Sequence, residues 1–287
     1  MRLKHDPRLL RRIANVKDFG KVAVLFGGDS AEREISLLSG NAVLAALKRR
    51  SVDAHAFDPR DLPLTDLTKH KFDRVWICLH GPGGEDGTLQ GALEYLGMPY
   101  TGSGVMGSAI GMDKLRTKRP AAAIGVAGAR TFVLTGPNDF EHCIEQLGLP
   151  LIVKPATQGS SVGMTKVEKA ADLPAAYADA AKHDRVVFAE SWITGGEYTV
   201  PILHGQALPS IRIETPKTFY DYEAKYFRDD TKYFCPSGLS APAEAHLASL
   251  AVAAFEAAGA EGWGRSDFMM DATGRPLLLV INTVPGM

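Results

Sequence analysis

Two apolar segments that each run into a glycine-rich turn constrain the fold of this chain more than any other feature. Residues 22–26 read VAVLF and precede Gly27 and Gly28, whereas residues 75–79 run into the loop HGPGGEDG. Continuous apolar runs of this length are typical of strands covered on both faces in a parallel sheet. Both turns are therefore expected at the carboxyl edge of one sheet, where ligands bind in open α/β folds.

A helix is predicted after the first turn. From Ser30 onward an apolar stripe recurs at spacings of three and four residues, formed by Ile35, Leu38, Val43, Leu44 and Leu47. Asp29 or Ser30 is placed to cap this helix, with Glu32 in its first turn. Glu32 also has a functional interpretation, because an acid beside free backbone N–H groups at a strand edge can bind the ammonium group of a zwitterionic ligand.

The remaining chain predicts further α/β segments. The middle part contains the strand LPLIVKP, the glycine- and serine-rich stretch QGSSVGM and a strand at residues 186–190. The last part contains a strand at 198–203, an alanine-rich helix at 242–258 and a hairpin of strands 267–270 and 277–281. A chain of 287 residues is expected to form two or three compact lobes.

Composition excludes several functional classes. A net charge of -1 gives no global attraction to nucleic acid or anionic lipid. No apolar run approaches the roughly 18–20 residues of a membrane helix, and residues 1–18 lack the apolar core of a secretory signal. We therefore expect a cytoplasmic protein without nucleic-acid or membrane partners. Cys78, Cys143 and Cys235 have no metal-like spacing and suit isolated reduced thiols.

Polar residues at predicted strand ends are candidates for ligand binding. His80 ends the second strand, where a histidine is more often a satisfied structural group, but it shares a glycine-rich loop with Glu85. Lys154 ends an apolar strand, where a buried ammonium needs a negative partner such as phosphate. The amides and hydroxyls of QGSSVGM can fold over phosphate oxygens, although a simple turn is the alternative. The stretch lacks the GxxxxGK[ST] pattern of P-loop proteins.

The predicted hairpin suggests a metal site. Residues 280 and 282 project to one face of their strand, and Asp267 on the partner strand can join them. A magnesium site would use oxygen ligands at all three positions. Asp267 and Asn282 supply oxygen, whereas Val280 supplies only methyl groups.

The longest motifs carry a resemblance to a known family. The segments FGGDSAEREISLLSG, HGPGGEDGTLQGALEYLGMPYTGSG, MDKLRTK, IVKPATQGSSVGM, FYDYEAKY, GWGRSDFMMD and NTVPGM resemble D-alanine–D-alanine ligase, in that enzyme's order, over residues 21–287. The resemblance implies an α/β ATP-grasp fold with an N-terminal parallel-sheet lobe at 1–103 and two further α+β lobes at 104–190 and 191–287. It also implies a homodimer.

The resemblance further implies a two-step reaction with ATP and Mg²⁺, or Mn²⁺, as cofactors. ATP phosphorylates the carboxylate of one D-alanine, and the amine of a second D-alanine attacks the acyl phosphate. The product, D-alanyl-D-alanine, enters peptidoglycan precursor synthesis. ATP-binding positions by motif matching are Lys114, Lys154, Glu190, Glu197 and Lys225, where the lysines serve the phosphates and Glu197 serves the ribose.

The same matching implies the substrate and metal positions. Glu32 pairs with the ammonium group of the first D-alanine and is linked to Ser160 and Tyr226, in a pocket that His80 and Glu85 also line. Arg265 and the amide of Gly286 stabilise the tetrahedral oxyanion. Asp267 and Asn282 hold the metal. The loop with Lys225 and Tyr226 is expected to close over bound substrate as a lid.

The chain departs from the family pattern at several positions. Val280 replaces a glutamate that helps to hold magnesium, so weakened catalysis is expected. The family continues past PGM with a segment that holds the carboxylate of the second substrate, so this subsite is expected to be incomplete in the sequence as written. Pro82, Arg119–Pro120 and Pro201 also differ from the usual residues, and proline in a helix or strand removes a backbone hydrogen bond.

These departures leave two alternatives to a working D-alanine–D-alanine ligase. The first is a catalytically impaired member of the family that binds nucleotide or D-alanine without ligating. The second is a D-alanine–D-lactate type ligase, although FYDYEAKY favours the dipeptide-forming branch.

Overall fold

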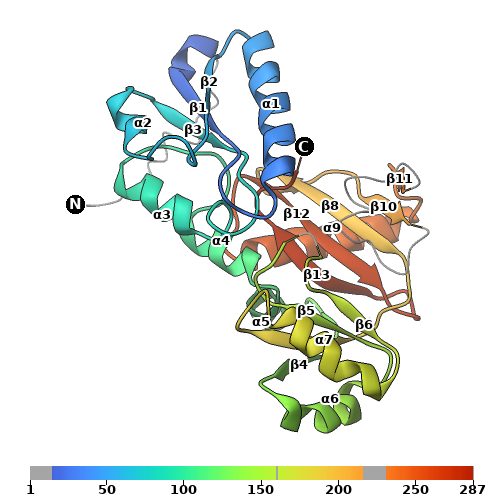
Figure 1. Ribbon diagram of the computed structural model, residues 1–287. Helices are drawn as coiled ribbons and strands as arrows, with labels where there is room; N and C mark the ends of the chain where they lie inside the picture. Colours follow the sequence, from blue (N-terminus) through green and yellow to red (C-terminus); the bar gives the residue numbers. More distant parts are fainter. Residues whose placement is uncertain (1–14, 160, 216–230, 287) are drawn as a thin grey trace. The chain divides into compact units, whose positions relative to one another are not determined.

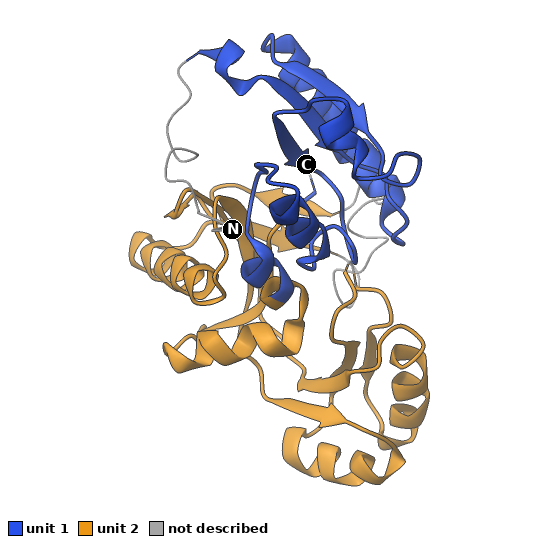
Figure 2. Ribbon diagram, turned by 90° about the vertical axis from the view of Figure 1, so that its left-hand side faces the viewer, with its two compact units in different colours: residues 1–109, 284–287 blue, residues 110–283 orange. Residues whose placement is uncertain are grey.

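The computed structural model describes residues 15–159, 161–215 and 231–286, and the chain divides into two compact units (Figures 1 and 2). Unit 1 comprises residues 1–109 and 284–287, and unit 2 comprises residues 110–283. The expected α/β fold class is confirmed, because one sheet is parallel and two are antiparallel. The three lobe boundaries expected from the sequence stay a prediction.

Unit 1 is built on a parallel sheet with the strand order β2-β1-β3. Its elements are β1 (Lys21–Leu25), α1 (Arg33–Arg49), β2 (Asp53–Phe57), α2 (Asp66–Lys69), β3 (Arg74–Ile77), α3 (Thr88–Tyr95) and the start of α4 (Val105–Met112), after a short 3-10 helix (Val16–Phe19). Both predicted strands are present and pair with each other. Val22, Val24 and Phe26 pack with Val43 of α1 in a shared core.

Three details of unit 1 differ from the sequence expectations. Strand β2 was not predicted, because its sequence DAHAF is short and only Ala54 and Phe57 in it are buried. Leu38, expected on the apolar stripe of α1, is 66% exposed. The helix begins at Arg33 with Glu32 as its N-cap, and no side chain caps it. Ser30 instead accepts a hydrogen bond from the Glu32 amide, so it supports the turn rather than the helix.

Unit 2 contains two antiparallel sheets, ordered β4-β7-β5-β6 and β11-β10-β8-β12-β13, with β9 paired to β8. Its strands are β4 (Thr131–Leu134), β5 (Leu151–Pro155), β6 (Thr165–Val167), β7 (Val187–Ser191), β8 (Glu197–Leu203), β9 (Gln206–Ala207), β10 (Ile211–Glu214), β11 (Lys232–Phe234), β12 (Trp263–Met270) and β13 (Pro276–Asn282). Its helices are α5 (Lys114–Ala123), α6 (Phe140–Leu147), α7 (Leu173–Ala180) and α9 (Ala241–Ala257), with 3-10 turns at Pro137–Asp139 and Ala170–Asp172.

Each sheet of unit 2 has its own apolar core. Helices α6 and α7 cover the first sheet, where Cys143 and Ala176 pack with Leu151 and Val153 of β5. Helix α9 covers the second sheet, where Leu247 and Phe255 pack with strand residues that include Phe268. The predicted hairpin of β12 and β13 is confirmed by its antiparallel register.

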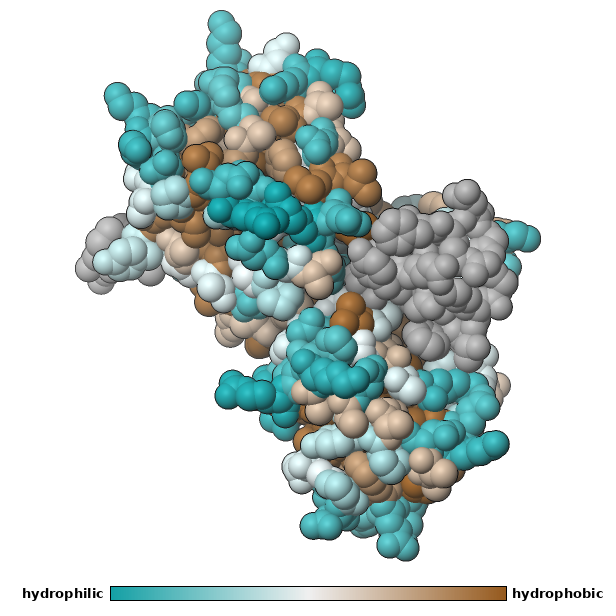
Figure 3. All heavy atoms as spheres, in the orientation of Figure 1, coloured by the Kyte–Doolittle hydropathy of each residue, from teal (hydrophilic) through white to brown (hydrophobic). Residues whose placement is uncertain are grey.

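The two prolines noted in regular elements do lie inside them. Helix α5 continues through Pro120, and strand β8 continues through Pro201, which lies opposite Arg265. All three cysteines are free, as expected. None of the described helices combines the length and apolar character needed to cross a membrane. On the face seen in Figure 3, hydrophobic residues are interspersed with hydrophilic ones rather than forming a continuous belt.

Candidate active site

The two glycine-rich turns of unit 1 meet at the carboxyl edge of its sheet, as the sequence predicted. The Ser30 hydroxyl after β1 donates a hydrogen bond of 2.7 Å to the carbonyl oxygen of His80 after β3. Gly81 has a φ of 74°, and a Cβ atom there would lie 3.3 Å from Ser30. A larger residue would therefore be strained at this contact. The turn places Glu32, which is 6% exposed, at the amino terminus of α1.

An ion pair between Arg33 and Asp58 fixes the first turn. Arg33 lies 2.8 Å from the carboxylate of Asp58 and donates to the carbonyl oxygen of Gly28, and the amide of Gly28 donates to Asp58 at 2.9 Å. Burial opposes ionisation of Asp58, but the hydrogen bonds from Arg33, Gly28 and Arg60 outweigh it and lower the pKa of this carboxyl group. The backbone beside Glu32 is thus held by charge-assisted hydrogen bonds.

His80 connects the second turn to the carboxyl-terminal segment of unit 1. Its Nδ1 lies 3.0 Å from the carbonyl oxygen of Val284, and its Nε2 lies 3.1 Å from the Ser39 hydroxyl. A carbonyl oxygen only accepts, so Nδ1 carries the proton. Gly286 lies against α1 near Ser39. Glu85 accepts a hydrogen bond from the amide of Gly81 at 2.9 Å, which folds the loop around His80.

In unit 2, buried charged groups converge on Glu190. One carboxylate oxygen of Glu190 accepts a hydrogen bond of 2.5 Å from Lys154, and the other forms an ion pair with Lys118. Glu190 and Lys154 are 1% and 7% exposed. Burial lowers the pKa of Lys118 well below its ordinary value, and the neighbouring charges of Lys154 and Lys114 lower it further. The negative partner expected for Lys154 is thus supplied in part by the protein.

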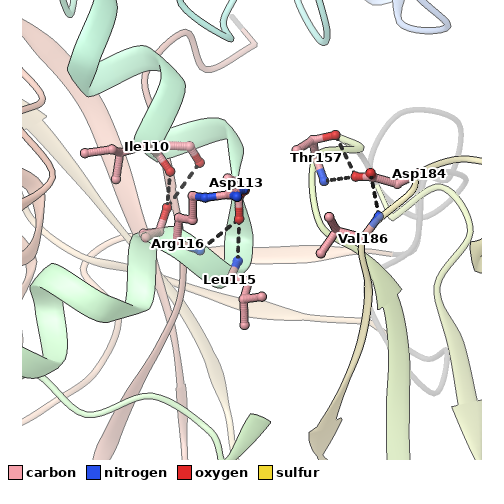
Figure 4. A network of polar contacts seen from close by, with 9 residues as sticks. Ile110, Asp113, Leu115, Arg116, Thr157, Asp184 and Val186 are labelled. Carbon is pink, nitrogen blue, oxygen red and sulfur yellow. Dashed lines mark hydrogen bonds and ion pairs between the residues drawn. The ribbon is translucent and has the colours of Figure 1, made fainter. Parts of the chain in front are cut away.

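Lys114 joins this cluster to the glycine- and serine-rich stretch. Its amide donates to the carbonyl oxygen of Ala156 at 2.9 Å, and its ammonium group donates to the carbonyl oxygen of Gln158. Asp113 caps α5 by accepting hydrogen bonds from the amides of Leu115 and Arg116, as Figure 4 shows. The cap sets the first turn of α5, and thereby the position of Lys114.

The hairpin brings together the two expected metal residues and Arg265, one of the expected oxyanion residues. In the ladder of β12 and β13, Asp267 lies opposite Val280 and Arg265 lies opposite Asn282. Arg265 contacts the Asp267 carboxylate at 3.0 Å, and the Thr199 hydroxyl of β8 donates to it at 2.7 Å. Among the described residues there is no group of three histidine, cysteine or acidic side chains that could hold a metal ion.

Not every expected residue belongs to these clusters. Glu197 begins β8 in the second sheet of unit 2 and lies opposite Met269 and Ile213. Ser160, Lys225 and Tyr226, and the lid predicted around the last two, lie outside the described residues.

Sequence reasoning missed Lys118, Thr199 and Ser39 as parts of these clusters. Lys118 had a signal, because it lies four residues after Lys114 and thus on the same face of α5. Thr199 and Ser39 are single hydroxyls within a strand and a helix, and no local pattern distinguishes them.

A parallel-sheet lobe, followed along the chain by antiparallel sheets that carry buried lysines and carboxylates, is the arrangement expected of the ATP-grasp ligases. The family described as D-ala D-ala ligase N-terminus matches residues 61–103, and D-ala D-ala ligase C-terminus matches residues 122–287. A D-alanine–D-alanine ligase of Laribacter hongkongensis is 56% identical over 269 residues, which are 94% of this chain and 87% of that protein. The chain therefore belongs to the D-alanine–D-alanine ligase family.

Solved structures agree with this assignment. D-alanine–D-alanine ligase from Bacillus anthracis has a TM-score of 0.81 at 33% identity, covering 93% of this chain and 88% of its own. Its ATP complex has a TM-score of 0.79 at 30% identity, covering 93% and 87%. The VanG D-Ala:D-Ser ligase from Enterococcus faecalis has a TM-score of 0.77 at 29% identity, covering 93% and 90%. These comparisons favour D-alanine–D-alanine ligase over the binding-only and D-alanine–D-lactate alternatives.

Proposed function

We propose that this protein joins two D-alanines to D-alanyl-D-alanine at the expense of ATP, through an acyl phosphate. The observation that carries the proposal is the convergence of Lys154, Lys118 and Glu190 in a buried position, with Lys114 linked to the adjacent glycine- and serine-rich stretch. Buried ammonium groups beside a loop rich in amides and hydroxyls suit the polyphosphate of a nucleotide.

In this proposal, Lys114 and Lys154 bind phosphate oxygens and Glu197 binds the ribose. Glu190 holds Lys154 and Lys118 in place beside the nucleotide. Positioning and charge neutralisation are what phosphoryl transfer requires of a protein, because the attacking and leaving oxygens must lie in line. Lys225, outside the described residues, is assigned to the transferring phosphoryl group.

Unit 1 binds the first D-alanine. The carboxylate of Glu32 pairs with its ammonium group, and His80 and Glu85 line the same pocket, with Ser160 and Tyr226 assigned to the closed state. The hydrogen bond from His80 to Val284 supports the backbone that presents the Gly286 amide. That amide and Arg265 stabilise the oxyanion that forms when the second amine attacks.

The metal fits the hairpin in part. Asp267 and Asn282 offer oxygen ligands, whereas Val280, opposite Asp267, offers none. Two side-chain ligands suit a Mg²⁺ ion that draws its other ligands from nucleotide phosphates and water. When bound there, Mg²⁺ or Mn²⁺ neutralises charge on the phosphate oxygens. Arg265 and Thr199 orient Asp267 for this contact.

By resemblance to the family, the proposal extends to a homodimer. By the same resemblance, it extends to a cytoplasmic location and to a role in peptidoglycan precursor synthesis. Sedimentation velocity at micromolar concentration measures the oligomeric state, and a single species at the monomer mass would contradict the homodimer.

Turnover and binding assays test the activity. The wild-type chain with ATP, Mg²⁺ and D-alanine is expected to form D-alanyl-D-alanine and ADP in equal amounts. Lys154→Ala should weaken ATP binding, and Glu32→Gln should raise the KM for D-alanine. Lys182→Ala removes an exposed lysine paired with Asp179. This control variant should leave ATP binding and the KM for D-alanine unchanged. No dipeptide and no ATP binding by the wild-type chain would refute the proposal.

A further inference from the structure

Asp184 anchors the point where β5 passes into the glycine- and serine-rich stretch. One carboxylate oxygen accepts hydrogen bonds of 2.7 Å from both the amide and the hydroxyl of Thr157. The other oxygen accepts a hydrogen bond of 3.0 Å from the amide of Val186. Figure 4 shows the hydrogen bonds of Asp184 to these two partners. The carboxylate therefore ties the end of β5 to the start of β7.

His183, which precedes Asp184, contacts the same stretch near both of its ends. The side chain of Gln158 donates a hydrogen bond of 2.8 Å to the carbonyl oxygen of His183. Gly163, near the far end, has a φ of 67°, and a Cβ atom there would lie 2.6 Å from the His183 ring. Residues 183–184 thus contact Thr157 just before the stretch, Gln158 at its start and Gly163 close to its end.

The residues next to Thr157 supply two hydrogen-bond acceptors of Lys114. Thr157 precedes Gln158, whose carbonyl oxygen accepts a hydrogen bond from the Lys114 ammonium group, and Ala156 accepts one from the Lys114 amide. A displacement of Thr157 would therefore displace both acceptors of Lys114. Such a shift matters because misplacing a binding group by about 1 Å can reduce the rate by about a hundredfold.

We infer that Asp184 is a positioning residue for nucleotide binding, which fixes Thr157 and thereby the adjoining stretch at residues 158–159 and 161–164 beside Lys114. The inference rests on the proposed function, since it assumes that this stretch contacts phosphate. Asp184 itself touches no substrate. Its carboxylate suits the task because each oxygen accepts from backbone amides, and an ionised acceptor forms shorter and stronger hydrogen bonds than a neutral one. The same hydrogen bonds lower the pKa of Asp184 against the opposing effect of burial.

The chain offers a matched control for this anchor. Asp139 accepts hydrogen bonds from the amide and the hydroxyl of Thr135 with one carboxylate oxygen, at 2.6 and 2.7 Å. The pair of hydrogen bonds matches the pair that Asp184 accepts from Thr157 and lies in the same unit, although it is more exposed and joins residues only four positions apart. Thr135 directly follows β4 and lies outside the stretch. Removing either carboxylate removes the same pair of threonine hydrogen bonds, but only the Asp184 variants should affect nucleotide binding.

The experiment compares Asp184→Asn and Asp184→Ala with Asp139→Asn and Asp139→Ala in the full chain. An asparagine has one oxygen, so it can keep either the Thr157 bonds or the Val186 bond but not both, whereas alanine loses all of them. We expect the dissociation constant and KM for ATP to rise about tenfold to a hundredfold, with a smaller change in the KM for D-alanine. Hydrogen exchange of the Thr157 amide should accelerate without nucleotide. Thr157→Val should share these effects, and Thr157→Ser, which keeps the hydroxyl, should restore ATP binding.

The outcomes separate the anchor from the proposed function. Equal effects of the Asp184 and Asp139 variants on ATP binding would reduce Asp184 to a general structural role and overturn the inference, as would wild-type ATP binding in Asp184→Ala. If the wild-type chain fails to bind ATP, the proposed function fails, and with it the role in nucleotide binding. Hydrogen exchange would still report separately whether Asp184 orders Thr157.

Discussion

Val280 lies directly opposite Asp267 in the antiparallel ladder of β12 and β13. Residues directly opposite each other on one face of a sheet have Cβ atoms only about 5 Å apart. A carboxylate at position 280 could therefore share a metal ion with Asp267, whereas valine presents methyl groups there. Asp267 itself is oriented by Arg265 and Thr199, so the protein keeps one well-placed acid in this ladder.

Val280→Glu should raise catalysis steeply, because it returns a charged oxygen ligand to a metal that neutralises the transferring phosphoryl group. We expect the D-alanine-dependent release of ADP to rise by about two to four orders of magnitude, which corresponds to several kcal/mol at about 1.4 kcal/mol per decade. ATP affinity should change modestly, because Lys114 and Lys154 do not depend on the metal. Val280→Gln, which has a similar shape without the charge, should recover far less. Equal turnover with valine and glutamate would mean that position 280 does not limit catalysis.

The two nitrogens of His80 should differ in importance. Asparagine can offer an N–H group near the position of Nδ1, which faces the Val284 carbonyl, whereas glutamine reaches the position of Nε2, which faces Ser39. We expect His80→Asn to retain the bond that supports the Gly286 backbone, and His80→Gln to lose it. The kcat of the glutamine variant should be lower by about tenfold, the effect of losing roughly 1.4 kcal/mol. A higher kcat for glutamine than for asparagine would assign the main role to the Ser39 contact.

Pro120→Ala should stabilise the protein. Pro120 lies inside α5, where it lacks the amide that would bond to the residue four positions earlier. Alanine should raise the free energy of unfolding by about 1–3 kcal/mol, since proline costs about 3 kcal/mol in a helix interior and some packing is lost. Pro242, in the first turn of α9, is the control, because proline is tolerated there. Thermal unfolding measures both, and a lower melting temperature for Pro120→Ala would show that its packing outweighs the missing hydrogen bond.

Asp58 should contribute stability that disappears in acid. Its pKa is lowered in the folded state, although burial opposes this, because Arg33, Gly28 and Arg60 donate to the ionised form. The unfolded chain therefore binds the proton first, at a pKa of about 3.9, and the contribution is present above that pH and lost as the pH falls through the folded value. Asp58→Asn should be less stable at pH 7 and lose less stability between pH 5 and 2. Urea unfolding across this range measures the difference, and parallel pH profiles would contradict the assignment.

Local sequence patterns were enough to predict the elements that frame the site. The apolar runs of β1 and β3, the strand before Lys154 and the β12–β13 hairpin all appear where they were expected. Periodicity and turn residues act within a few positions along the chain, so these elements are encoded locally. The family motifs likewise depend only on residue order. The same local signals failed for β2, whose few buried residues give no clear alternation.

Only the tertiary structure decided which side chains share a partner. Lys118, Lys154 and Glu190 come from a helix and two strands, and their meeting depends on the pairing of β5 with β7 and on the placement of α5. His80 meets Val284 across 204 positions of the sequence. Asp184 was not singled out by any pattern, because its role arises from the distance to Thr157. Contacts of this kind are fixed by strand order, register and packing between distant segments, and residue spacing along the chain does not specify these.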